Sequence, residues 1–155
     1  EALSLLAGQM PIEIRHQAGK KNTEKAVAQY RGLGLKADVL PFIDDMAAMY
    51  GWADLAICRS GALTVSELAA AGVASVLIPY PFAVDDHQTA NGRYLSDAGA
   101  ALLISQKELT AEKLARELKP LMNRDALLSM ARKARAKAQP ESTDTVVAAC
   151  LRGGK

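Results

Sequence analysis

Short apolar runs alternate along the chain with longer stretches in which apolar residues recur every three or four positions. The short runs predict strands, and the spaced pattern predicts helices. The predicted strands lie at residues 12–14, 39–43, 55–58, 75–78 and 101–104. The predicted helices between them lie at residues 22–33, 45–50, 62–71 and 86–97. Because this alternation is typical of βαβ units, we expect an α/β fold in which a parallel sheet carries helices on both faces.

After Thr110 the pattern is helical only. Thr110 is expected to cap a helix that Pro120 closes, and two further helices are expected at residues 124–139 and 141–151. The helix at 124–139 carries a basic cluster, which consists of Arg132, Lys133, Arg135 and Lys137. The cluster indicates either a solvated helix face or a surface attracted to anionic lipid.

The beginning of the chain departs from the usual order of a doubly wound domain. Such domains begin with a strand whose following turn binds phosphate, whereas residues 1–8 follow a helical pattern. We therefore expect that the first strand and its glycine-rich turn are missing, and that the chain is a truncated domain.

Composition narrows the class of protein further. The chain has 155 residues, of which 50% are apolar, so it can bury a core of single-domain size and is not disordered. The net charge of +2 does not point to a nucleic-acid partner. Cys58 and Cys150 lack the spacing of a metal site or a disulfide framework, which fits a reducing cytosol.

Ligands of parallel α/β sheets bind beyond the carboxyl ends of the strands. We therefore expect the segments that follow Ile14, Ile43, Cys58 and Ile78 to converge on one crevice. After Cys58, a turn of small residues at 60–62 leads into a helix, whose free amides and dipole would favour a phosphate or diphosphate. The segment is neither a GxGxxG motif nor a Walker loop, so neither a dinucleotide oxidoreductase nor a P-loop ATPase is favoured.

Glu67 lies one turn inside this predicted helix and allows two interpretations. Its carboxylate could accept hydrogen bonds from a vicinal diol such as that of a ribose. Alternatively, Thr64 and Glu67 form a capping box that satisfies the helix amides without any ligand. Spacing alone leaves both interpretations open.

A polar helix start follows the strand at 75–78. His87, Gln88 and Asn91 fall within about one helical turn, and their side chains suit the recognition of sugar hydroxyls. Two alternatives remain open at this point. Asp85, Asp86 and His87 could hold a metal ion, or an aspartate could cap the helix with its neighbours facing solvent.

Two other strand ends are ambiguous. At residues 42–46, Ile43 could lie against a flat base and read it through main-chain groups, or the segment could be an ordinary strand-to-helix turn. At residues 16–19, the sequence His-Gln-Ala-Gly either orients a ligand or closes a turn.

Taken in order, residues 42–46, residues 58–67 and the pattern His87-Gln88-x-x-Asn91 resemble the MurG-type lipid I N-acetylglucosaminyltransferases of bacterial peptidoglycan synthesis. The resemblance covers nearly the whole chain. It implies one Rossmann-like half of a GT-B glycosyltransferase, namely the carboxyl-terminal half that holds the donor UDP-N-acetylglucosamine. Residues 1–140 would form this donor domain, and residues 141–155 would pack back on the absent amino-terminal domain.

The resemblance also implies a set of donor contacts. Ile43 would contact uracil through its main chain, and Glu67 would hold the ribose hydroxyls. Gln88, with His87 beside it, would bind hydroxyls of N-acetylglucosamine. The diphosphate would face the helix start, at Ala62, Leu63 and Thr64, with Val65 and Ser66 completing the segment.

No catalytic base, metal or cofactor is implied for this half, because the proposed base of the family is a histidine of the other half. Ala18 stands where the His-Gln-x-Gly motif of the family usually has a hydroxyl residue.

The implied activity is the inverting transfer of N-acetylglucosamine to the muramyl sugar of lipid I, which gives lipid II. The family works at the cytoplasmic face of the inner membrane as a peripheral protein, in a pathway that serves cell shape and division. The isolated chain is expected to be inactive, because lipid I binds the absent half. The alternatives are a stand-alone nucleotide-sugar-binding subunit with a membrane-bound partner, a related UDP-sugar enzyme, and a non-catalytic α/β domain whose motifs only cap helices.

Overall fold

The computed structural model describes residues 1–9, 11–82 and 84–152. The chain has two compact units, the first made of residues 1–53 and 107–127, and the second of residues 54–106 and the chain from 128 onward. Each unit contains helices and parallel strands, so the predicted α/β class is confirmed. None of the described helices is both long and apolar enough to cross a membrane.

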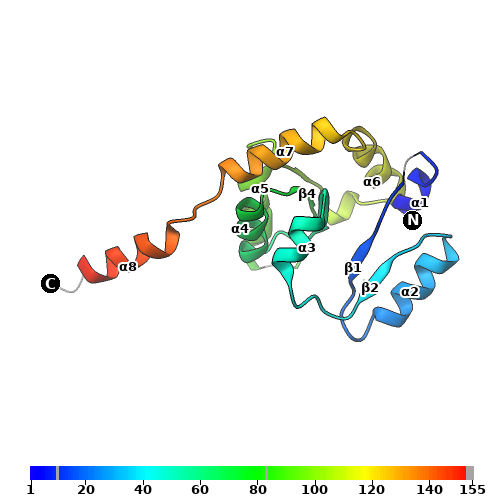
Figure 1. Cartoon of the computed structure of the whole chain (residues 1–155), viewed down its shortest axis with the longest axis horizontal. Coiled ribbons are helices and arrows are strands. Elements are labelled where there is room, and N and C mark those ends of the chain that lie inside the picture. Colours follow the sequence, from blue (N-terminus) through cyan, green and yellow to red (C-terminus); the bar gives the residue numbers. More distant parts are fainter. Residues whose placement is uncertain (10, 83, 153–155) are drawn as a thin grey trace. The chain divides into compact units, whose positions relative to one another are not determined.

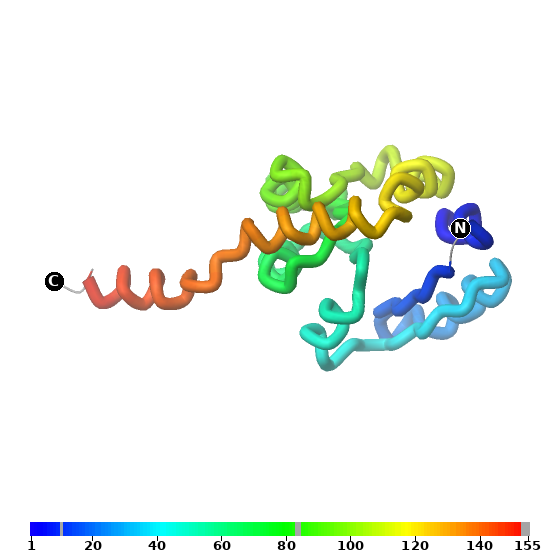
Figure 2. The backbone as a smooth tube through the Cα atoms, turned by 45° about the horizontal axis from the view of Figure 1, so that its top comes forward, coloured from blue at the N-terminus to red at the C-terminus, as the bar shows by residue number. Residues whose placement is uncertain are grey.

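The first unit contains a parallel pair of strands with a helix alongside (Figure 1). Its elements are α1 (Ala2–Leu6), β1 (Arg15–Gln17), α2 (Thr23–Gly32), β2 (Asp38–Leu40), α3 (Met46–Trp52), α6 (Ala111–Leu118) and the short 3-10 helix η3 (Lys119–Leu121). Figure 2 shows α1 in dark blue beside α6 in yellow, and the two helices are in contact. Both bury apolar side chains, Leu6 in α1 and Leu118 in α6.

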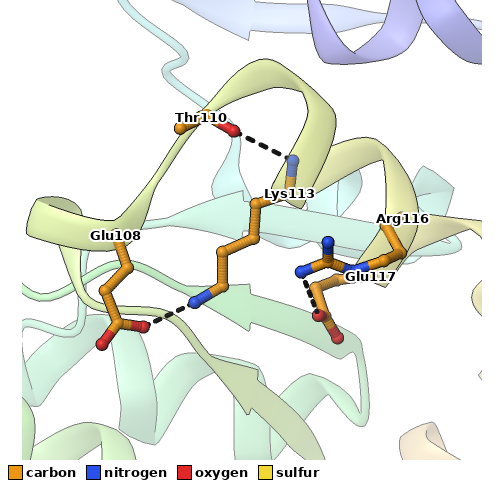
Figure 3. Close-up of polar contacts among 5 residues, drawn as sticks. All are labelled: Glu108, Thr110, Lys113, Arg116 and Glu117. Carbon is orange, nitrogen blue, oxygen red and sulfur yellow. Dashed lines mark hydrogen bonds and ion pairs between the residues drawn. The ribbon is translucent and has the colours of Figure 1, made fainter.

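The start of α6 forms as the sequence predicts (Figure 3). The hydroxyl oxygen of Thr110 accepts a hydrogen bond of 3.1 Å from the main-chain amide of Lys113, which is an N-cap contact. The ammonium group of Lys113 pairs with the carboxylate of Glu108, and this partner lowers the pKa of Glu108 below its ordinary value. These exposed contacts fix the local turn and add little to stability.

The second unit is built on a three-stranded parallel sheet with β4 in the centre. Its elements are β3 (Leu55–Cys58), α4 (Ala62–Ala71), β4 (Ala74–Leu77), the 3-10 turn η1 (Val84–Asp86), α5 (His87–Ser96), β5 (Ala101–Leu103), most of α7 (Arg124–Ala136), and α8 (Ser142–Arg152). Every residue of β4 is buried, and Leu68 of α4 and Leu95 of α5 are fully buried. The core of this unit therefore lies between β4 and these two helices, which contact each other.

Predictions about two strands and about the number of sheets are wrong. The first strand is β1 at Arg15–Gln17 rather than at residues 12–14, and β2 ends at Leu40 rather than at Ile43. The main-chain carbonyl of Ile14 accepts a hydrogen bond of 2.8 Å from Asp38, so the ladder starts only where the apolar run ends. The described strands also form two parallel sheets, β1-β2 and β3-β4-β5, instead of the single sheet expected.

Two residues of the basic cluster, Arg135 in α7 and Lys137 just after it, contact the carboxyl ends of α4 and α5 in the same unit. The guanidinium group of Arg135 donates to the main-chain carbonyl of Ala70 in the last turn of α4. The ammonium nitrogen of Lys137 lies 4.7 Å from the centre of the Tyr94 ring, and the Tyr94 hydroxyl donates to the Lys137 carbonyl at 2.6 Å. Cations are favourable at these helix ends because the helix dipole is negative there. Arg135 and Lys137 are thus engaged within the protein.

Candidate functional site

The amino-terminal end of α4 offers main-chain amides that are not used by the helix itself. Gly61 occupies the N-cap position, and the first hydrogen bond of the helix runs from the Val65 amide to the Gly61 carbonyl at 2.9 Å. The amides of Ala62, Leu63 and Thr64 precede that bond. Because glycine has no side chain to cap them, these amides and the positive end of the helix dipole remain suited to an anionic ligand.

The capping-box interpretation of Thr64 and Glu67 is wrong. The helix begins at Ala62, so Thr64 is already its third residue and is not the N-cap. Glu67 lies farther along α4, with its side chain exposed. The side chain of Val65 is only 5% exposed, so this residue can reach a ligand only through its main chain. Among the remaining predicted residues of the segment, Ala62, Leu63 and Ser66 are exposed.

Hydrogen bonds join the start of α5 to the segments that follow β3 and β4. The Ser60 hydroxyl donates to the main-chain carbonyl of Gln88 at 2.7 Å, and the Asn91 side-chain amide donates to the Ser60 carbonyl at 3.2 Å. The Tyr80 main-chain amide donates to the side-chain oxygen of Gln88 at 2.9 Å. The structure therefore brings the predicted Gln88 next to the segment that leads into α4, while His87 lies beside it with an exposed side chain.

Arg59 is a residue of this region that the sequence analysis did not single out for any role. Its guanidinium group donates to the main-chain carbonyls of Ile78 at 3.2 Å and Pro79 at 3.1 Å, and lies 5.5 Å from the centre of the Tyr80 ring. Tyr80 in turn packs edge to face on Phe82, with ring centres 5.6 Å apart. Arg59 thus holds the carboxyl end of β4, and no spacing pattern in the chain could have indicated it.

The aspartates before α5 act locally. Asp85 and Asp86 both have a φ of 52°, which is the left-handed conformation that aspartate tolerates better than most residues. Asp86 occupies the N-cap position, but its carboxylate accepts from the Thr89 hydroxyl at 2.6 Å rather than from a main-chain amide. Among the residues that the structure describes, no group of three or more His, Cys, Asp or Glu side chains could hold a metal ion.

Ile43 belongs to the first unit, whereas the other predicted site residues belong to the second. The main-chain amide of Ile43 donates to the side-chain oxygen of Gln17 at 2.9 Å, so the last residue of β1 is tied to the loop after β2. His16 packs edge to face on Tyr30, whose pKa is raised by burial. The Asp45 carboxylate caps α3 by accepting from the Ala48 amide at 2.8 Å, as expected of an ordinary strand-to-helix turn.

Comparison with known proteins assigns the chain to a glycosyltransferase family. The model of the glycosyltransferase family 28 C-terminal domain matches residues 1–146. A relative from Marinobacter nauticus is 53% identical over 97% of this chain and 42% of its own length, and one from Pseudomonas paraeruginosa is 54% identical over 92% of this chain and 42% of its own length. Both are named UDP-N-acetylglucosamine–N-acetylmuramyl-(pentapeptide) pyrophosphoryl-undecaprenol N-acetylglucosamine transferase. The chain thus spans less than half the length of these relatives.

Solved structures agree with this assignment. The crystal structure of Acinetobacter baumannii MurG is 49% identical, with a TM-score of 0.91, and the match covers 97% of this chain and 44% of that one. The glycosyltransferase VinC, solved in complex with dTDP, is 17% identical, with a TM-score of 0.61 over 81% of this chain and 32% of its own, and supports the fold alone. The chain therefore belongs to the glycosyltransferase family 28 C-terminal domain family.

Proposed function

We propose that this chain binds UDP-N-acetylglucosamine and forms the donor half of an enzyme that transfers N-acetylglucosamine to the muramyl sugar of lipid I, giving lipid II. The observation that carries the proposal is that the first amides of α4 are uncapped and that Ser60, which precedes this helix, holds Gln88 by a hydrogen bond. Relatives that are more than half identical bear the name of this transferase. The anion-binding helix start and the neighbouring amide supply the two kinds of contact that a nucleotide sugar needs.

The diphosphate would bind the start of α4. The amides of Ala62, Leu63 and Thr64 donate to its oxygens, and the main chain of Val65 with Ser66 completes the segment. The carboxylate of Glu67 accepts hydrogen bonds from the two ribose hydroxyls. Charge-assisted bonds of this kind are stronger than bonds between neutral groups, so Glu67 should contribute strongly to nucleotide affinity.

The sugar would bind at the start of α5. The side-chain oxygen of Gln88 is held by the Tyr80 amide, so the amide nitrogen is the end that donates to a sugar hydroxyl. His87 lies beside it and contributes a second polar group.

Uracil would bind at Ile43. Because the Ile43 amide donates to Gln17, the Ile43 carbonyl is the group available to a base. It accepts from the N3–H of uracil, whereas cytosine has an acceptor at that position and would be disfavoured.

In the reaction, the acceptor hydroxyl attacks the anomeric carbon and gives its proton to a base of the acceptor half, while the bond from the anomeric carbon to the diphosphate oxygen breaks and UDP leaves with inversion of configuration. Negative charge develops on the diphosphate as the bond breaks. The preorganised amides of α4 stabilise that charge without having to reorient.

The activity of the whole enzyme requires the acceptor half, which would bind lipid I at the cytoplasmic face of the inner membrane. Residues 141–155, which include α8 and of which 153–155 lie outside the described residues, would pack on that half. We therefore expect this chain to bind donor but not to turn it over.

The test is calorimetric titration of this chain with UDP, UDP-N-acetylglucosamine, ADP and NADH, together with thermal unfolding. A ligand at 100 times its Kd should add about 2.7 kcal/mol of stability. Binding confined to the two uridine ligands would support the proposal, and binding of none of the four, or of ADP and NADH equally, would contradict it.

A variant locates the ribose contact. Glu67→Ala should weaken UDP binding by about 10- to 100-fold, the loss expected for a charged hydrogen-bonding partner. The effect should be smaller for 2′-deoxy-UDP, which lacks one of the two hydroxyls. Asp97→Ala is the matched control, because Asp97 is an exposed carboxylate that follows the opposite end of α5 from Gln88. Equal affinities in Glu67→Ala and the wild type would remove Glu67 from the site.

A further inference from the structure

Two serines of the second unit are fully buried but differ in their hydrogen bonding. Ser60 and Ser75 both have 0% exposure. The Ser75 hydroxyl, on β4, has no hydrogen-bond partner among the described residues, whereas the Ser60 hydroxyl donates to the Gln88 carbonyl at 2.7 Å. A buried hydroxyl is costly unless it is bonded, so the bond of Ser60 is a specific contact within the core.

Ser60 occupies the junction between α4 and α5. It directly precedes Gly61, the N-cap of α4, and it contacts α5 through Gln88 and Asn91. These two residues and Gly92 lie three and four positions apart, so they share one face of α5. A Cβ at Gly92 would lie 3.4 Å from the Ser60 Cβ and 2.5 Å from a methyl carbon of Leu103. Glycine at this position therefore lets α5 come close to Ser60.

Gln88 is consequently held at two points. Ser60 binds its main-chain carbonyl, and the Tyr80 amide binds its side-chain oxygen. The first contact ties Gln88 to the residue next to the α4 amides, and the second orients its side chain. Together they set the distance between the helix start and the amide nitrogen of Gln88.

We propose that Ser60 is a positioning residue, which fixes the spacing between the α4 amides and the Gln88 amide and so matches the site to a diphosphate with an attached sugar. The inference rests on the proposed function, because it assigns the amides to the diphosphate and Gln88 to the sugar. Ser60 itself touches no ligand. Its loss should therefore affect the sugar contact and leave the contact with the nucleotide largely unchanged.

Ser60→Ala and Ser75→Ala form a matched pair. Each change removes one buried hydroxyl from the same unit, but only the first removes a hydrogen bond to α5. Asn91→Ala is a second variant that keeps the Ser60 hydroxyl and removes the other bond between Ser60 and α5. The measured quantity is the ratio of the Kd for UDP-N-acetylglucosamine to the Kd for UDP, which a general loss of stability would not change.

We expect this ratio to rise by about three- to tenfold in Ser60→Ala, the effect of losing one neutral hydrogen bond. A smaller rise is expected in Asn91→Ala, and no change in Ser75→Ala. A ratio in Ser60→Ala equal to that of the wild type, or an equal rise in Ser75→Ala, would overturn the inference.

Hydrogen exchange of the ligand-free chain separates this inference from the proposed function. In Ser60→Ala the amides of α5 should exchange about three- to tenfold faster near Gln88, while those of β4 keep the wild-type rate. If the wild-type chain bound no uridine nucleotide, the proposed function would fail, and this exchange pattern would still decide whether Ser60 holds Gln88. Unchanged exchange near Gln88 would overturn the positioning role.

Discussion

The backbone conformation and the neighbours of Gly72, which ends α4, determine how much stability a substitution there should cost. It has a φ of +71° and a ψ of 54°, the left-handed conformation. Its amide donates to the Ala69 carbonyl at 3.2 Å, and the Val73 amide donates to the Leu68 carbonyl at 3.1 Å. These two bonds form a Schellman motif, which satisfies the last carbonyls of the helix and requires the left-handed residue at this position.

Gly72→Ala should destabilise the second unit for two reasons. An L-residue in the left-handed region costs about 1–2 kcal/mol. The new Cβ would also lie 3.2 Å from the Cβ of Arg135 and 3.4 Å from the Ala131 carbonyl oxygen, so α7 must shift slightly. The lower entropy of the unfolded alanine chain offsets roughly 0.4–1 kcal/mol of this cost. The offset leaves roughly 0–1.6 kcal/mol of the conformational cost. With the added cost of the close contacts, we expect a net loss of about 1 kcal/mol, which lowers the Tm by a few degrees.

The assay is urea and thermal unfolding followed by circular dichroism. Gly51→Ala is the control, because Gly51 is an exposed residue of α3 and its added Cβ would meet no heavy atom within 4 Å. That variant should gain about 0.5–1 kcal/mol. Donor affinity should stay the same in Gly72→Ala, because Gly72 lies at the opposite end of α4 from the amides. A Gly72→Ala chain as stable as the wild type would refute the reasoning.

Two further predictions concern Cys58 and α8. Burial raises the pKa of the Cys58 thiol from 9.0 to about 11. Between these pH values the unfolded chain loses the proton and the folded chain keeps it. The contribution of this thiol to the free energy of unfolding is therefore full below pH 9 and falls by about 2 kcal/mol up to pH 11. Unfolding titrations should show a smaller alkaline loss of stability in Cys58→Ala than in the wild type, and equal losses would contradict the assignment. No residue of α8 is buried, so its amides should exchange far faster than those of α4, and strong protection of α8 would contradict this.

The sequence predicted those elements whose boundaries are set by local chemistry. α4 runs from Ala62 to Ala71 as expected, because small residues precede it and Gly72 ends it. β3 also has its predicted bounds at Leu55–Cys58. The strand expected at residues 12–14 was displaced because its apolar run does not by itself determine where pairing with β2 begins.

The sequence indicated the side chains of the proposed site but not the residues that hold them in place. Gln88 was singled out because its own amide suits a sugar. Ser60 and Arg59 act through main-chain carbonyls that lie 28 and 19 residues away along the chain. Every residue has such a carbonyl, so no pattern of residue types indicates which one a side chain will contact.

The sequence could not exclude the capping-box interpretation for a related reason. The spacing of Thr64 and Glu67 is the same whether the helix begins before or at Thr64. The main-chain bonding decides the question, because the Val65 amide donates to the Gly61 carbonyl at 2.9 Å and the helix is therefore already formed at Thr64.

The two ends of α4 show how this helix can be stable and still leave its start open to a ligand. At the carboxyl end, the amides of Gly72 and Val73 and the guanidinium group of Arg135 bind the last carbonyls. At the amino end, Gly61 leaves the first amides uncapped. Replacing a capping side chain by glycine costs only a few tenths of a kcal/mol, whereas any such side chain would occupy an amide that an anion could use. The closed carboxyl end and the core face of α4 therefore hold the helix in place, so that its amides are already oriented when a diphosphate arrives.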